Sequence, residues 1–398
     1  MDHPSDFESF KNEIKAALQN NDQALAAAKI QQYLVQENKI PLNIAITGES
    51  GSGKSSFVNA FRGMENGDEG AAPTGCVETT LEVTPYPHPN FPNVTLWDLP
   101  GIGSTSFPAD EYLEHVGFEK FDFFIIISDT RFRENDVKLT REIQRMKKKF
   151  YFVRSKTDEN IRNEGRSQRE FNAERTLAQI RENCIQGLQK QGVESPQVFL
   201  VSNFELHLYD FHQLEETLER DLPAHKRNAL LFAMPNVSLE IINKKKKAFQ
   251  AQIKYIALGS AAVAAVPLPG LSIVVDVALL VDAVTQYVVG FGLDSWSVQR
   301  LADTTHVPLK DLTDIIVSPL ALTKITPDLV IKLCCQFGIT SAIIAAEEAT
   351  RFIPIFGIPL AMTFSFTSTY KILYTFLNML AEDAQRVFTK ALGLNTSV

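Results

Sequence analysis

Short apolar runs alternate with amphipathic segments between residues 41 and 223 of the chain. The apolar runs predict strands at residues 42–47, 82–86, 94–98, 121–128, 150–155 and 197–202. The amphipathic segments predict helices at residues 54–62, 134–148, 170–190 and 209–222. Alternating strands and helices form a largely parallel sheet with helices on both faces, and the nearly all-apolar run at 121–128 is typical of a central strand. This part of the chain is therefore predicted to be an α/β domain.

Only helical spacing is found on either side of this region. Apolar residues recur at helical intervals before about residue 38, and every segment after Pro223 has a helical pattern. The length of 398 residues corresponds to about two domains. We therefore expect N-terminal helices at residues 1–38, the α/β domain at 39–224 and an all-α domain at 225–398.

Two long apolar stretches, at residues 255–293 and 339–380, dominate the predicted all-α domain. Each is interrupted by prolines and glycine, at 267–270 in the first stretch and at 354–359 in the second. A membrane-spanning helix needs about 20 apolar residues, and the prolines divide these stretches into shorter pieces. We expect two buried helical hairpins. The alternatives are a transmembrane helix and a core hairpin that also dips into a membrane interface.

The basic run Lys244–Lys247 lies on a helix predicted at residues 239–252. Consecutive lysines on a helix are expected to form a solvated face. If the apolar hairpins meet a membrane, the same lysines would favour anionic lipid headgroups.

The charge balance and the cysteines exclude several classes of protein. The formal net charge is −8, whereas a nucleic-acid-binding face is usually basic, so no nucleic-acid partner is expected. The four cysteines show no CxxC spacing, which indicates a reducing compartment. The N-terminus has no signal-peptide pattern, Asp2 stands where a myristoylated chain has glycine, and the C-terminus forms no prenylation box. We expect a cytoplasmic protein whose association with intracellular membranes would be peripheral.

The stretch GESGSGKSS lies between the first predicted strand and the first predicted helix. The spacing Gly48-x4-Gly53-Lys54-Ser55 is that of a P-loop, whose glycines let backbone N–H groups approach a phosphate. Lys54 is expected to reach the β- and γ-phosphates and Ser55 to hold Mg²⁺. The predicted phosphate-binding residues are Gly48, Glu49, Ser50, Gly51, Ser52, Gly53, Lys54, Ser55 and Ser56.

A second motif ends the strand predicted at residues 94–98, where Asp98 is followed by Leu-Pro and Gly101. Asp98 is placed to hold Mg²⁺ through water, and the Gly101 N–H can contact a γ-phosphate. A contact at that position senses whether the third phosphate is present, which predicts a nucleotide switch.

The element Ser155-Lys156-Thr157-Asp158 follows the fifth predicted strand. In such an element the Asp158 carboxylate accepts hydrogen bonds from N1–H and the 2-amino group of guanine, which adenine lacks, and the Lys156 stem packs along the base. At the end of the next strand, the backbone of Ser202 or Asn203 could donate to guanine O6. The expected ligands are therefore GTP and GDP with Mg²⁺, and ATP is the disfavoured alternative.

A switch loop is expected between the first helix and the second strand, where the chain holds Thr74, Glu78, Thr79 and Thr80. One threonine of such a loop usually completes the Mg²⁺ shell in the triphosphate state. Thr80 is favoured for this role, with Thr74 next.

The chain lacks the glutamine that usually orients the attacking water after the second switch glycine, because Ile102 follows Gly101. An aliphatic side chain cannot orient water. Either hydrolysis is slow, or the role falls to Glu49, to Glu78 or to a group from a second molecule.

These motifs resemble those of the vertebrate immunity-related, or interferon-inducible, GTPases, and the resemblance covers essentially the whole chain. It is carried by GESGSGKSSFVNAFRG, GAAPTGCVETT, YPHPNFPNVTLWDLPGIGST, FDFFIIISDTRF, KKKFYFVRSKTD, VFLVSNFE, YDFHQLEETLERDLPAHKR and MLAEDAQRV. The resemblance implies a Ras-like P-loop GTPase domain of α/β class and a helical domain formed from both chain ends. It also implies nucleotide-dependent self-association through the nucleotide faces, and action at intracellular membranes in cell-autonomous defence.

The resemblance further implies roles for single residues. The switch-loop glutamate and threonine that the family uses in dimer-coupled hydrolysis fall on Glu78 and Thr74. Lys54 stands where one subfamily has methionine, which places the chain with the hydrolysing members. Asp2 departs from the myristoylated members, so their mode of anchoring is not expected here.

Two functions from different classes follow from these patterns. The first is a GTPase that assembles with GTP and disassembles on hydrolysis, at or near membranes. The second is a nucleotide-switched structural or membrane-binding module with negligible GTP turnover, which Ile102 keeps open.

Overall fold

The computed structural model describes residues 40–75, 80, 82–102, 116–130, 132–167, 170–264, 271–338 and 360–393, together with a few isolated positions before residue 40. The chain divides into two compact units. One comprises Pro41–Leu222 and Phe232–Val237, and the other the described parts of Met1–Ile40, Pro223–Leu231 and Ser238–Val398. The helices expected at residues 1–38 lie almost entirely outside the described residues, so they stay a prediction.

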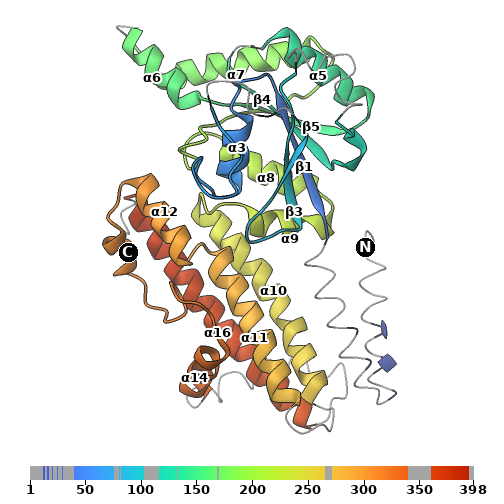
Figure 1. Ribbon diagram of the computed structural model, residues 1–398, viewed down its shortest axis with the longest axis vertical. Helices are drawn as coiled ribbons and strands as arrows, with labels where there is room; N and C mark the ends of the chain where they lie inside the picture. The colour runs from blue at the N-terminus through green and yellow to red at the C-terminus, as the bar shows by residue number, and fades with distance from the viewer. Residues whose placement is uncertain are drawn as a thin grey trace. The chain divides into compact units, whose positions relative to one another are not determined.

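The first unit is built on a six-stranded sheet with the strand order β2-β3-β1-β4-β5-β6 (Figure 1). The strands are β1 (Leu42–Gly48), β2 (Thr84–Pro87), β3 (Val94–Asp98), β4 (Phe123–Ser128), β5 (Lys149–Arg154) and β6 (Val198–Leu200). All neighbours are parallel except β2 and β3, which confirms the predicted, largely parallel sheet. β4 lies inside the sheet and all its residues are buried, as its apolar run predicts.

The helices of this unit are α3 (Lys54–Phe61), α5 (Glu134–Arg145), α6 (Thr157–Ser167), α7 (Ala173–Gln189) and α8 (Phe211–Asp221). α3 and α8 meet through Phe57, Phe61 and Phe211, whose ring centroids are 6.1 to 6.3 Å apart. α5 and α7 belong to a separate buried cluster, which includes Leu139 and Cys184. Both clusters pack against the sheet. Because its parallel strands end at the same edge, the predicted motifs that follow them lie at that edge.

Helix α6 is an element that the sequence pattern does not predict. Of its residues only Thr157 is buried, and most of the others are charged or polar. The helix therefore has no apolar face, and without one the sequence shows no helical period. Its position matters, because Asp158 lies in its first turn.

The described part of the second unit is helical, as predicted. Its helices are α9 (Ala224–Ala233), α10 (Leu239–Ala264), α11 (Leu271–Gly290), α12 (Ser295–Thr305), α13 (Leu309–Thr313), α14 (Pro327–Gly338) and α16 (Leu360–Ala391). α10, α11 and α16 pack side by side (Figure 1). The fully buried ring of Phe249 in α10 contacts Tyr287 of α11, with centroids 4.9 Å apart. The proline- and glycine-containing breaks at 267–270 and 354–359 lie outside the described residues.

One described segment, Val277–Thr305, is long and apolar enough by length and composition to cross a membrane. Buried core helices have the same property, and 44% of the most apolar window of this segment is buried. Within the segment α11 ends at Gly290 and α12 begins at Ser295, where the Asp294 side chain caps the new helix by accepting from Ser297 N–H at 3.0 Å. The segment by itself does not assign a membrane span.

Lys245 contradicts the expectation that the lysine run forms a solvated face. Lys245 is 1% exposed, and its Nζ donates to the carbonyl of Gly290, the last residue of α11, at 2.9 Å. A cation at this position stabilises the helix C-terminus, whose last carbonyl groups have no intrahelical donor. Lys244 pairs with Glu240 at 3.3 Å and Lys247 is exposed, so the run is divided between core and surface.

Candidate functional site

The P-loop follows β1 and turns directly into α3. Gly48 and Gly53 have φ angles of 144° and 93°, which glycine adopts readily because it has no Cβ. A Cβ at Gly48 would lie 2.1 Å from the carbonyl oxygen of Ile127. Lys54 is buried, and its Nζ donates to the Glu49 carbonyl at 2.9 Å. The loop is thus a backbone cradle with the motif lysine held across it.

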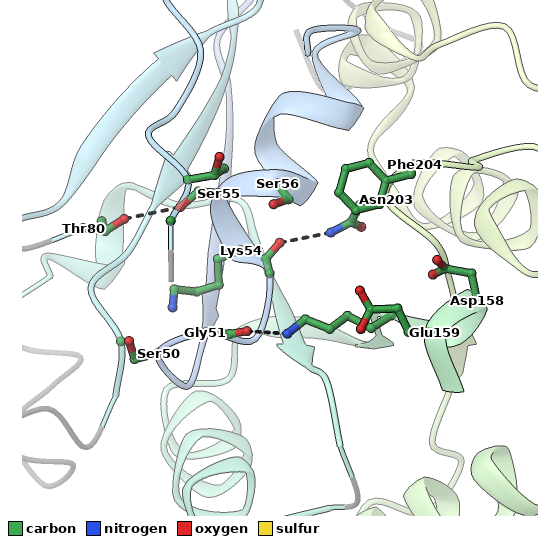
Figure 2. Close-up of a pocket in the computed structure, with 15 residues that line it drawn as sticks. Ser50, Gly51, Lys54, Ser55, Ser56, Thr80, Asp158, Glu159, Asn203 and Phe204 are labelled. Carbon is green, nitrogen blue, oxygen red and sulfur yellow. Dashed lines mark hydrogen bonds between the residues drawn. The ribbon is translucent and has the colours of Figure 1, made fainter. Parts of the chain in front are cut away.

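Ser55, Thr80 and Asp98 bring oxygen atoms together beside the P-loop. Asp98 Oδ2 accepts hydrogen bonds from Ser55 Oγ at 2.6 Å and from Thr80 Oγ1 at 2.9 Å. Figure 2 shows the third contact, 3.4 Å between the Ser55 and Thr80 hydroxyl groups. Burial raises the pKa of Asp98, while the hydrogen bond from Ser55 and the charge of Lys54 lower it.

This oxygen set fits Mg²⁺. Carboxylate and hydroxyl oxygens are the ligands that Mg²⁺ takes in nucleotide sites, and the buried Oδ1 of Asp98 accepts no hydrogen bond from any described residue. A divalent cation would offset the burial of that carboxylate. No hydrogen bond joins Thr74 to these three side chains in the described part of the chain, so the geometry favours Thr80 for this role.

Gly101 and Ile102 pack against the P-loop after β3. A Cβ at Gly101 would lie 2.8 Å from the backbone nitrogen of Ser50, so only glycine allows this approach. Ile102 donates its N–H to the Gly48 carbonyl at 3.2 Å, and its side chain is 3% exposed within the core. The side chain after the switch glycine therefore faces the core and cannot reach an attacking water.

The base side of the site is formed after β5. Lys156 Nζ donates to the Gly51 carbonyl at 2.9 Å (Figure 2) and pairs with Asp129 at 3.1 Å. The Asp158 side chain is 11% exposed and lies 3.6 Å from Arg162, one turn later in α6. Sequence reasoning finds Lys156 and Asp158 but misses Asp129 and Arg162, which fix the two motif side chains by charge.

Ser155 and Asn203 support the P-loop from the neighbouring strand ends. Ser155 Oγ donates to the Ser52 carbonyl at 2.6 Å, and Asn203 Nδ2 donates to the Gly53 carbonyl at 3.1 Å (Figure 2). Ser202 is buried, and its Oγ accepts from two backbone N–H groups of the following turn. The Ser155 and Asn203 side chains therefore position the P-loop, a role that their motif does not predict, whereas the Ser202 hydroxyl holds the turn that follows β6.

One pocket of about 400 Å³ joins these elements. Figure 2 shows Ser50, Lys54 and Thr80 toward one end and Asp158 with Phe204 toward the other. The lining also includes Gly51, Gly53, Ser55, Ser56, Thr74, Gly101, Lys156, Glu159 and Asn203. The two ends correspond to the predicted phosphate and base positions. Glu159 and Phe204 were not predicted; Phe204 is 62% exposed and follows the Ser-Asn motif directly.

Glu49 belongs to the P-loop but is not among the residues that line this pocket. Its carboxylate contacts the Arg133 guanidinium and accepts from Asn135 Nδ2 at 2.8 Å. The Glu49 carboxylate is thus held by α5 and its N-cap rather than by the residues that line the pocket, which does not favour Glu49 as the group that orients water. The other candidate on this chain, Glu78, lies outside the described residues.

A largely parallel sheet with a P-loop after β1, switch elements after α3 and β3 and a guanine element after β5 defines a P-loop GTPase. The model of the interferon-inducible GTPase family matches residues 8–391. The chain belongs to this family, which supports GTP binding and hydrolysis.

Two proteins that are named interferon-inducible GTPases are similar to this chain over nearly its full length. Interferon-inducible GTPase 5 of Rattus norvegicus is 43% identical over 381 residues, which are 95% of this chain and 82% of the relative. Interferon-inducible GTPase 1 of Mus musculus is 38% identical, covering 94% of this chain and 88% of the relative. Among solved structures, the bacterial dynamin GTPase LeoA overlaps 99% of this chain and 97% of its own at 14% identity and a TM-score of 0.37.

Proposed function

We propose that the chain is a GTP-hydrolysing switch that self-associates through its nucleotide face in the GTP state and acts at intracellular membranes in cell-autonomous defence. The observation that carries the self-association is the burial of Ile102. Among the described residues that line the phosphate end of the pocket, the side chains are hydroxyl groups and Lys54, none of which replaces a water-orienting glutamine. Efficient turnover would then require Glu78 or a group from a second molecule.

Five residues of the phosphate end have roles in this proposal. Lys54 would contact the β- and γ-phosphates, and Ser55, Thr80 and Asp98 would hold Mg²⁺. When bound, the cation supplies charge that neutralises the developing charge on the phosphates. The Gly101 N–H would contact the γ-phosphate. Loss of that phosphate on hydrolysis would then release the segment that carries Gly101.

Association is expected to depend on the third phosphate. A non-hydrolysable GTP analogue should convert the full chain from a monomer to a dimer or larger species, measured by light scattering, whereas GDP should leave a monomer. Thr74 lines the pocket and matches the threonine that the family uses in dimer-coupled hydrolysis. Thr74→Ala is therefore expected to weaken this association. An unchanged mass with saturating analogue would contradict the proposal.

We propose a cytoplasmic location with action at membranes. The surface part of the lysine run on α10 supports the membrane action. Lys246 is half-buried and Lys247 is exposed, and such lysines attract anionic headgroups at about 1 kcal/mol each near a membrane surface. The full chain should float with anionic vesicles at low salt, and Lys246→Glu with Lys247→Glu should reduce flotation. Lys310→Glu, at an exposed position of α13, is the matched control. Equal flotation of all three proteins would rule out this surface.

A further inference from the structure

The P-loop carries a carboxylate that the switch chemistry described above does not use. Glu49 lies between the phosphate-binding Gly48 and Ser50, and its side chain is 19% exposed. A nucleoside triphosphate is strongly anionic, so an unpaired carboxylate in this loop would repel it. Nucleotide binding at this loop is therefore favoured if a nearby cation neutralises the Glu49 carboxylate.

Two side chains from the start of α5 meet the Glu49 carboxylate. Arg133 contacts one oxygen through its guanidinium, and Asn135 donates to the other at 2.8 Å. We call this three-residue arrangement, Glu49 with Arg133 and Asn135, the Glu49 clasp. Its charge pair keeps the carboxylate against α5, and the contact to each oxygen restricts its rotation.

The α5 side of the clasp is itself anchored in the core. Asp136 is buried and accepts hydrogen bonds from the Arg133 backbone N–H at 2.9 Å and from Ser128 Oγ at 3.2 Å. Burial raises the pKa of Asp136 to about 6, so this carboxylate is still mostly charged at neutral pH. Ser128 ends the central strand β4, and the start of α5 is thereby fixed to the sheet.

Glu49 also joins the parts of the phosphate site to each other. Its carbonyl accepts from Lys54 Nζ at 2.9 Å, and its backbone forms a parallel bridge with Ile102. Displacement of this residue would move the motif lysine and the segment that carries Gly101 together. The clasp is thus connected through backbone to both the P-loop and the second switch element.

We infer that Arg133, assisted by Asn135, is a positioning residue for nucleotide binding: it holds the Glu49 carboxylate, neutralised, away from the phosphates and fixes the P-loop to α5. The inference rests on guanine-nucleotide binding at the P-loop. It assigns a function to a surface arginine that lies outside the recognised nucleotide motifs.

The test is a double-mutant cycle on the full chain, with equilibrium affinities for GDP and for a non-hydrolysable GTP analogue as readouts. Arg133→Gln should lower analogue affinity about tenfold, and GDP affinity less, because the freed carboxylate acts most strongly on the ligand with more charge. In a chain that already carries Glu49→Gln, the same change should have little effect, because no carboxylate remains to be neutralised. Arg133→Lys should restore most of the affinity.

The matched control is Arg145→Gln, which removes an exposed arginine paired with Glu142 at 2.9 Å in the same helix. It should leave both affinities unchanged. The deficit of Arg133→Gln should shrink as salt is raised, since a partly exposed charge is screened, whereas a folding defect would not respond in this way.

Wild-type affinity in Arg133→Gln would overturn the inference, and so would an equal loss in the Glu49→Gln background. Failure of the wild-type chain to bind guanine nucleotide would instead contradict the function on which the inference rests. The two failures are therefore distinguishable in one set of titrations.

Discussion

Asp158→Asn is expected to lower the affinity for GTP about a hundredfold. The asparagine oxygen can still accept from guanine N1–H, but the hydrogen bond from the 2-amino group to a charged carboxylate is lost, and such a bond contributes roughly 1.5–3 kcal/mol. The carboxylate is 11% exposed in the first turn of α6 and lines the base end of the pocket. An asparagine there would present an amide donor to a C2 oxygen. The variant should therefore gain affinity for xanthosine triphosphate, whose base carries that oxygen in place of the amino group.

Competition titrations with GTP, xanthosine triphosphate and ATP measure this change of specificity. Glu159→Gln is the matched control, since Glu159 neighbours Asp158 and lines the same pocket. The control should keep the preference for GTP. Unchanged GTP affinity in Asp158→Asn, or equal binding of ATP and GTP by the wild-type chain, would contradict the assignment of the base end.

Lys54→Ala is expected to reduce nucleotide affinity strongly and to bring GTP turnover below detection. Lys54 is 6% exposed and is already held across the P-loop by the Glu49 carbonyl. Its charge is therefore positioned before the nucleotide arrives, and positioned charge is the main source of catalysis in phosphoryl transfer. Phosphate release at saturating GTP gives the turnover, and thermal unfolding shows whether the variant folds.

Lys138→Ala provides the comparison for this variant. Lys138 is a partly exposed lysine of α5 that pairs with Glu134 at 3.5 Å, one helical turn away. Its loss should leave turnover unchanged, because exposed pairs of this kind contribute little. Wild-type turnover in a folded Lys54→Ala chain would show that the hydrolytic site lies elsewhere.

The phosphate and base ends of the site could be predicted because their motifs are local. Gly48 to Ser56 is a contiguous strand–turn–helix, and its spacing alone specifies a phosphate cradle. Asp98 and Asp158 follow strands that the apolar runs reveal, and parallel strands bring their carboxyl ends to one edge. The proximity of Ser55, Thr80 and Asp98 agrees with the preference for Thr80, although a single sequence leaves Thr74 open.

Other features depend on contacts between segments that no local pattern joins. The run of four lysines gives no sign that Lys245 alone lies against the end of α11, because that contact requires the packing of two long helices. The Glu49 clasp joins residues separated by 84 and 86 positions. Glu, Arg and Asn are common on protein surfaces, so nothing in the sequence marks these three as partners. Helix α6 is missed because charged and polar residues make up most of it and leave it without an apolar face.

We propose that a second copy of the chain completes the hydrolytic site, because the buried Ile102 side chain cannot orient water. The alternative is that Glu78 of the same chain supplies this group. The rate of phosphate release per molecule, measured at saturating GTP over a wide range of protein concentration, tests this claim most directly. The expected result is a low rate in dilute solution that rises with concentration and then reaches a plateau. A rate per molecule that stays constant at every concentration, whether zero or finite, with GTP binding intact, would contradict it.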